Sequence, residues 1–60
     1  MGDRFLTTTE VANELRRTAA TLRSWRHAGK GPRFHRVGGK ALYAREDVEA
    51  FIASTRIEAS

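Results

Sequence analysis

A stripe of apolar positions near the start of the chain gives the first sign of regular structure. Its members recur at i, i+1 and i+4, on one face of a helix: Val11, Ala12 and Leu15. Just before it, Thr7 and Glu10 have the spacing of a capping box, in which each side chain accepts from the other residue's amide. Leu6 and Val11 can pack together across this cap as a hydrophobic staple. We therefore predict a helix over residues 8–15.

A second apolar pattern follows after a short break. Its small and apolar residues keep a helical rhythm: Ala19, Ala20, Leu22, Trp25 and Ala28. Thr18 is suited to cap the N-terminus, and Gly29 can end the helix because glycine readily adopts the left-handed conformation found there. We predict a helix over residues 19–28, joined to the first by a three-residue turn. Two short helices connected in this way form the helix-turn-helix pattern.

The segment after the second helix changes to a β pattern. Residues 30–32, Lys-Gly-Pro, interrupt the helical rhythm. Two β-capable runs, 33–37 and 40–43, then flank the dipeptide Gly38-Gly39. Because both glycines can take a positive φ, this arrangement predicts a β-hairpin with a two-residue turn. Hydrophobic alternation is imperfect in both runs, so the strand register stays open.

The last pattern is again helical. Its apolar stripe consists of Val48, Phe51 and Ile52. Glu46 and Asp47 fall in the first turn, where the helix dipole favours acidic side chains. We predict a helix over residues 45–53. The order helix, helix, hairpin, helix indicates an α+β fold that is mostly helical.

The aromatic side chains can be assigned to the core or to a binding surface. Trp25 lies at helical spacing from Leu22, which favours a place in the core over stacking on a nucleic-acid base. We expect the same of Phe34, Tyr43 and Phe51, with the Tyr43 hydroxyl near the surface.

Length and composition exclude several classes of protein. The 60 residues form one small domain, 1–60, and we expect order over about 5–55 and frayed ends at 1–4 and 58–60. Without cysteine there is no disulfide, thiolate zinc site or cysteine nucleophile. No apolar run approaches the roughly 20 residues of a membrane span, and no signal peptide is evident, so we expect a soluble intracellular protein.

Catalytic, cofactor and metal sites are also not indicated. Ser24 has no identifiable base and orienting group, and the carboxylates do not form a catalytic pair. Gly38-Gly39-Lys40 lacks the length and the hydroxyl residue of a phosphate-binding P-loop. His27 and His35 lie on different elements, and their spacing does not resemble a metal site. We expect no enzyme activity, no cofactor and no small-molecule ligand.

Charge is strongly segregated along the chain. The segment from residue 16 to residue 40 contains eight basic residues and no acidic one: Arg16, Arg17, Arg23, Arg26, Lys30, Arg33, Arg36 and Lys40. The net charge of +4 therefore combines +8 in the middle with −4 in the flanks. A folded segment with this charge is expected to bind a polyanion.

The second predicted helix carries a polar face. Four residues share it at i, i+3, i+4 and i+7, and two lie at its margins: Ala20, Arg23, Ser24 and His27, with Thr21 and Arg26. The small Ala20 permits close approach to a groove floor, and the N-terminus with Thr18 and Thr21 can meet a phosphate. The alternative is an ordinary solvated face. The lack of nearby acidic partners favours binding.

The turn and the hairpin extend this basic surface. Arg16 and Arg17 lie in the turn, either in contact with phosphate or solvated, and they carry a conformational cost relative to glycine. The predicted hairpin carries basic residues around its glycine turn: Arg33, Arg36, Gly38, Gly39 and Lys40. Such a ribbon can follow a DNA backbone or enter a minor groove. The alternative is a soluble turn whose charges prevent pairing of its edges.

Taken in order, these segments resemble the excisionase-type DNA-binding domains, small winged helix-turn-helix proteins related in fold to the MerR-type regulators. The resemblance covers about residues 5–53 and rests on five stretches: Leu6–Ala12, Thr21–Arg26, Gly31–Phe34, Val37–Gly39 and Tyr43–Ile52. The chain departs from the usual pattern at Arg16 and Arg17, where a glycine and an aliphatic residue are common.

The resemblance implies that the second helix enters a major groove and that the hairpin, as a wing, grips the adjacent minor groove or backbone. It also implies a module without the effector domain of MerR-type activators, most like a bacteriophage excisionase of the host bacterial cytoplasm, associated with the nucleoid. Such proteins bind adjacent sites beside a prophage attachment site, bend the DNA and direct a tyrosine integrase towards excision. Arg23 and Arg26 are then the best candidates for guanine contacts.

Other hypotheses remain open from the sequence. One is a small transcriptional regulator of the same fold, and another is an adaptor whose basic face binds an acidic protein. A single small module has limited specificity, so we expect cooperative binding to several sites. Head-to-tail self-association on DNA would place acidic residues of 46–58 against the basic segment 16–40 of the next copy.

Overall fold

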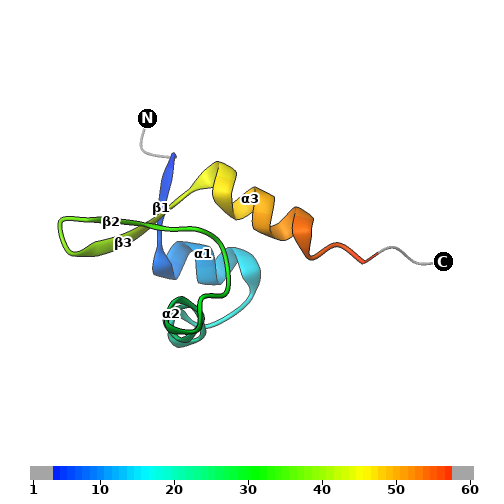
Figure 1. The fold of residues 1–60 in the computed structure, drawn as a ribbon, viewed down its shortest axis with the longest axis horizontal. Helices are drawn as coiled ribbons and strands as arrows, with labels where there is room; N and C mark the ends of the chain where they lie inside the picture. Colours follow the sequence, from blue (N-terminus) through cyan, green and yellow to red (C-terminus); the bar gives the residue numbers. More distant parts are fainter. Residues whose placement is uncertain (1–3, 58–60) are drawn as a thin grey trace.

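A computed structural model describes residues 4–57 of the chain, and its element order is the one that the sequence predicts, with one added strand (Figure 1). The elements are β1 (Phe5–Thr7), α1 (Thr8–Leu15), α2 (Ala19–Ala28), β2 (His35–Val37), β3 (Lys40–Ala44) and α3 (Arg45–Ser54). The winged helix-turn-helix fold is therefore confirmed. The frayed ends expected at 1–4 and 58–60 lie outside the described residues except for Arg4, whose carbonyl accepts from the Arg45 amide at 2.7 Å.

Local sequence signals account for the start of α1. The Thr7 amide donates to Glu10 Oε1 at 2.9 Å, and the Glu10 amide donates to Thr7 Oγ1 at 3.1 Å. The capping box is therefore confirmed. Val11 and Ala12 on the inner face of α1 are buried, as their spacing predicts.

The turn between α1 and α2 requires an unusual backbone conformation. Arg16 has φ 58° and ψ 44°, and it is the one non-glycine residue with positive φ among residues 4–57. Its amide donates to the Asn13 carbonyl at 3.2 Å, and the Arg17 amide donates to the Ala12 carbonyl at 2.8 Å. This paired pattern is a Schellman motif, in which glycine normally occupies the left-handed position. The predicted conformational cost therefore falls on Arg16.

Replacing Arg16 with glycine should stabilise the domain by about 0.5–1 kcal/mol, because glycine takes the left-handed conformation without the steric clash of a Cβ atom. The midpoint of urea unfolding, followed by circular dichroism, measures this change. Arg16→Ala is the matched control, since it removes the same charge but keeps the Cβ atom. A similar gain in both variants would assign the effect to charge repulsion instead.

The sheet contains one strand that the sequence did not reveal. Its order is β1-β3-β2, with both pairs antiparallel. β1 pairs Phe5 with Ala44, and the predicted hairpin pairs Val37 with Lys40 around Gly38-Gly39, which have φ 56° and 85°. Two positive φ values are what a two-residue type I′ turn requires.

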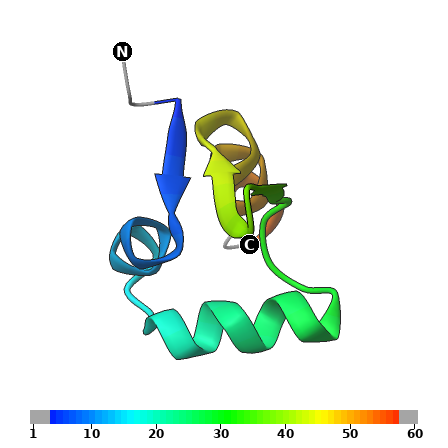
Figure 2. The same cartoon turned by 90° about the vertical axis from the view of Figure 1, so that its left-hand side faces the viewer.

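The core lies where α1, α2 and α3 meet the sheet (Figure 2). Its buried members come from all of these layers: Leu6, Val11, Ala12, Leu22, Tyr43 and Val48. Trp25 is only partly buried and packs at the edge, where its ring lies 5.8 Å from that of Phe51. A Cβ atom on Gly31 would come within 2.9 Å of Trp25 Cε3, so the chain can cross this ring only as glycine.

One core assignment, Phe34, was wrong, and one member of the predicted apolar stripe of the last helix, Ile52, is exposed. Phe34 is 37% exposed, because it precedes β2 at the base of a hairpin that projects beyond the helices (Figure 1). Ile52 is 44% exposed because the outer turns of α3 extend past the sheet (Figure 1). Tyr43, by contrast, is buried as predicted, but its hydroxyl is not at the surface as expected, because it accepts a hydrogen bond from Arg26 Nη1 inside the fold.

No helix within residues 4–57 has the length and apolar character needed to cross a membrane.

Candidate nucleic-acid interface

The outer face of α2 presents the side chains that the sequence assigns to it. Arg23, Ser24 and His27 are exposed, together with Ala20 one turn earlier, whereas Leu22 on the opposite face is completely buried. The ten residues of α2 lie along one side of the molecule, across the lower edge of Figure 2. The helix therefore offers an open polar surface that carries one arginine, one serine and one histidine.

The N-terminus of α2 is closed by its own threonines. Thr18 Oγ1 accepts from the Thr21 amide at 3.1 Å, and the two hydroxyl groups lie 3.0 Å apart. Thr18 is thus the predicted N-cap. The cap leaves the amides of Ala19 and Ala20 without an acceptor in the helix itself.

Arg26 differs from the other basic residues of α2 because it is held inside the fold. It is half-buried, and its Nη1 donates to Thr8 Oγ1 at 3.1 Å and to Tyr43 Oη at 2.8 Å. Its guanidinium carbon lies 5.5 Å from the centroid of the Phe34 ring. Arg26 therefore connects α2 to the start of α1, to β3 and to the base of the wing.

The wing places its cations beside this anchor. Arg36 and Lys40 are exposed on the two strands of the hairpin, with Gly38 and Gly39 at its tip. The Arg36 guanidinium carbon lies 5.9 Å from the same Phe34 ring, so one aromatic side chain has two guanidinium groups next to it. A ring of this kind attracts cations through its quadrupole and offsets part of their repulsion.

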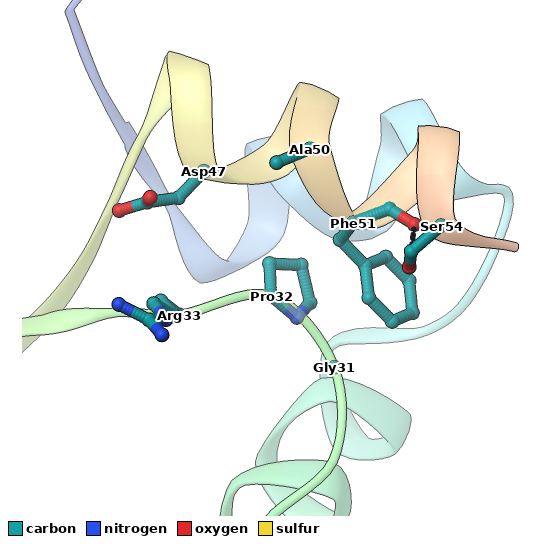
Figure 3. A pocket seen from close by; sticks show the side chains of 7 residues that line it. All are labelled: Gly31, Pro32, Arg33, Asp47, Ala50, Phe51 and Ser54. Atoms are coloured by element: carbon teal, nitrogen blue, oxygen red, sulfur yellow. Dashed lines mark hydrogen bonds between the residues drawn. The ribbon is translucent and has the colours of Figure 1, made fainter.

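Arg33 lies in a different place from the other wing residues. It lines a hollow of about 390 Å³ between the segment 31–33 and α3. Figure 3 shows its side chain on the segment that faces α3, opposite Asp47 of that helix. Arg33 also lines a second hollow with Arg26 and Phe34, but neither Arg36 nor Lys40 lines either of these two hollows, although the sequence groups the three cations.

Two hollows bring the remaining predicted residues together. One, of about 160 Å³, is lined by Arg23, Arg26, His27, Phe34 and Arg36, between α2 and the wing. The other, of about 300 Å³, lies between the start of α1 and the wing, and Arg26 and Arg36 line it as well. The recognition helix and the wing therefore share one basic surface. Arg16 and Arg17 line neither hollow and lie at the other end of α2.

The charge segregation seen in the sequence persists in three dimensions. Three salt bridges occur among residues 4–57, and they are Arg4–Glu46 at 3.8 Å, Arg45–Glu14 at 3.1 Å and His35–Asp47 at 3.7 Å. None of them uses any of the eight basic residues between positions 16 and 40. The acidic groups of the flanks are thus partly neutralised by other residues, and the basic surface keeps its charge.

Sequence reasoning missed three contributors to this surface. Thr8 and Tyr43 hold Arg26, and Phe34 lies beside two guanidinium groups. The threonine run was interpreted only as a cap, and the aromatic residues only as core. The one available signal was that Arg26 lies at the margin of the polar face, next to the buried side of α2.

A family model described as "Helix-turn-helix domain" matches residues 5–56, which include every helix and strand described above. No significant match was found among curated proteins or among solved structures.

Proposed function

The chain belongs to the helix-turn-helix domain family, and from this premise we propose that it is a sequence-specific, DNA-bending excisionase. Membership of the family supports double-stranded DNA as the partner, and domains of this kind are typically not enzymes. The observation that carries the proposal is the basic surface that α2 shares with the wing, without an acidic partner among residues 4–57.

The dimensions of α2 suit a major groove. An α-helix with its side chains is about 10–12 Å across, which fits the roughly 12 Å width of a B-DNA major groove, and the ten residues of α2 give about 15 Å of helix to lie in it. Arg23 is the proposed base reader, because it is exposed and an arginine can donate two hydrogen bonds to a guanine. Ser24 and His27 lie beside it, and Arg16 and Arg17 are proposed to contact phosphates at the other end of the helix.

The architectural role follows from the small size of the module. One domain of this type buries roughly 600–1,000 Å² on DNA, which limits the specificity of a single copy. We therefore propose cooperative binding to adjacent sites beside a prophage attachment site, DNA bending, and assistance to a tyrosine integrase in a bacterial cytoplasm. The helix-turn-helix family includes excisionase-like proteins. The second candidate is a small transcriptional regulator, which the same basic surface would serve.

Self-association on DNA would depend on few acidic groups. On α3, Glu46 and Asp47 face Arg4 and His35 within the same copy. Glu49 is exposed and is in none of the salt bridges found among residues 4–57. We propose Glu49 as the acidic residue that approaches the basic segment of a neighbouring copy.

A gel-shift titration on DNA from the chain's own genomic locus, against scrambled DNA of equal length, tests the function. Stepwise, cooperative and bent complexes beside an attachment core would support the excisionase. A single simple complex at a promoter would support the regulator. Absence of duplex binding at low salt would contradict both and leave the protein adaptor.

Replacing Arg23 with alanine should weaken binding to the preferred sequence by about 1–3 kcal/mol and relax the preference at one base pair, because a bidentate base contact is lost. Lys40→Ala is the control, since loss of a phosphate contact weakens binding to all sequences alike. Fluorescence anisotropy with a set of single-base variants measures both effects. An equal loss on every sequence for Arg23→Ala would exclude Arg23 as a base reader.

A further inference from the structure

The hollow between α1 and the wing collects positive charge from three separate elements. Arg26 comes from α2, Arg36 from β2 and Lys40 from β3, and the first residues of α1 complete the wall. No acidic residue lines this hollow, in contrast to the one beside α3, where Asp47 is present. A concave site with three cations and no carboxylate is chemically suited to an anion.

Arg26 gives the strongest indication that this site suits an anion. Its Nη1 bonds only to the neutral oxygens of Thr8 and Tyr43. No carboxylate of residues 4–57 lies within 4.0 Å of its guanidinium, although the side chain is half-buried. A partly buried charge is costly unless an opposite charge approaches it. The guanidinium also has further N–H groups available to an acceptor.

The start of α1 adds donors to the same wall. The capping box uses the amides of Thr7 and Glu10, and Thr8 and Thr9 occupy the first two helical positions. Helical geometry gives the amides at these positions no acceptor within the helix. An anion in the hollow would therefore meet the positive end of the α1 dipole in addition to the three cations. The exposed Glu10 carboxylate is bound to the Thr7 amide and does not line the hollow.

We propose that this hollow, the α1–wing pocket, binds a single phosphate of the DNA backbone, and that Arg26 is a positioning residue of this pocket and not a base reader. The inference rests on the proposed DNA-binding function. Arg36 and Lys40 supply the exposed cationic contacts, and Arg26 fixes the start of α1 and the wing around the phosphate. Because Arg26 and Arg36 also line the hollow beside Arg23 and His27, the bound phosphate sets the register of α2 in the groove.

Single methylphosphonate substitutions, scanned through the binding site defined by footprinting, test the pocket because each one removes one phosphate charge. One position should weaken binding of the wild-type protein about tenfold, as expected for loss of charge-assisted hydrogen bonds. Arg36→Ala and Lys40→Ala should each reduce the effect of that position. Arg17→Ala is the matched control and should keep it, since Arg17 lies outside the pocket.

The role of Arg26 has its own readout in base preference. Arg26→Gln should weaken binding to all sequences by a similar factor, reduce sensitivity to the same methylphosphonate and leave the preferred bases unchanged. Tyr43→Phe removes one hydrogen-bond acceptor of Arg26 but keeps the buried ring, so this variant can test the role of Arg26 if Arg26→Gln does not fold. It should likewise reduce sensitivity to that methylphosphonate without changing base preference.

The failures of the two proposals can be distinguished. A protein that does not bind unmodified duplex DNA would overturn the proposed function together with the pocket. Binding that is normal but equally sensitive to every phosphate would overturn only the pocket. A change of the preferred base in the Arg26→Gln variant would show that Arg26 contacts a base, and would overturn its proposed role as a positioning residue.

Discussion

Raising the salt concentration from about 50 mM to about 200 mM should weaken DNA binding by roughly a thousandfold, because binding of about six phosphates releases the counterions condensed on them. Eight basic residues with no salt-bridge partner among residues 4–57 make this number of contacts possible. On a plot of log affinity against log salt, the slope should be about −5. Fluorescence anisotropy at several salt concentrations measures it.

Controls on both protein and DNA sharpen this measurement. Arg17→Ala should reduce the magnitude of the slope by about one, as expected for one lost phosphate contact. Scrambled DNA should give weaker binding with a steep slope, since the electrostatic term does not depend on sequence. A slope near zero would contradict the proposed phosphate-binding surface and would favour an adaptor that recognises a protein.

Replacing Leu22 with alanine should destabilise the domain by about 2–5 kcal/mol, through lost hydrophobic transfer energy and the cavity left behind. Leu22 has 0% exposure and lies on the inner face of α2. A domain of 60 residues is expected to have only about 3–9 kcal/mol of total stability. A large part of the population should therefore unfold, with loss of DNA binding.

Thermal unfolding followed by circular dichroism measures this effect. Ile52→Ala is the matched control, because Ile52 is also aliphatic and helical but 44% exposed, and the change should stay below about 1 kcal/mol. If Leu22→Ala has the same midpoint of thermal unfolding as the wild-type protein, the Leu22 side chain does not stabilise the core.

The helices could be predicted because their signals are local. The capping box at Thr7 and Glu10, the Thr18 cap and the Gly29 stop each involve residues within one turn of a helix end. The Gly38-Gly39 turn is equally local, and its two positive φ values are confirmed. Such features are determined by neighbouring residues, and no knowledge of the tertiary structure is needed to identify them.

β1 could not be predicted because its evidence is distant in the sequence. It contains three residues, of which only Leu6 is buried, so it has no pattern longer than one side chain. Its partner is β3, near the other end of the chain. Phe34 was misassigned for a related reason, since its exposure depends on how far the wing projects.

The sequence predicted that the candidate site is a charged surface, but it could not predict which of its residues are exposed for binding and which are held by other elements. Helical spacing placed Arg23, Ser24 and His27 on the open face of α2. It could not show that Arg26 is bonded to Thr8 and Tyr43, because both partners lie on other elements. Nor could helical spacing show that Arg33 lies apart from Arg36 and Lys40, opposite Asp47 of α3.

The pairing of Phe5 with Ala44 links positions about 40 residues apart, most of the length of the domain. Closing a loop of this size costs chain entropy that contacts within α1 and α2 do not. The two helices can therefore form early in folding, whereas β1 and β3 join late. Because the α1–wing pocket has one wall from Thr7–Thr9 and the other from β2 and β3, we expect this pocket to be complete only when β1 has joined β3.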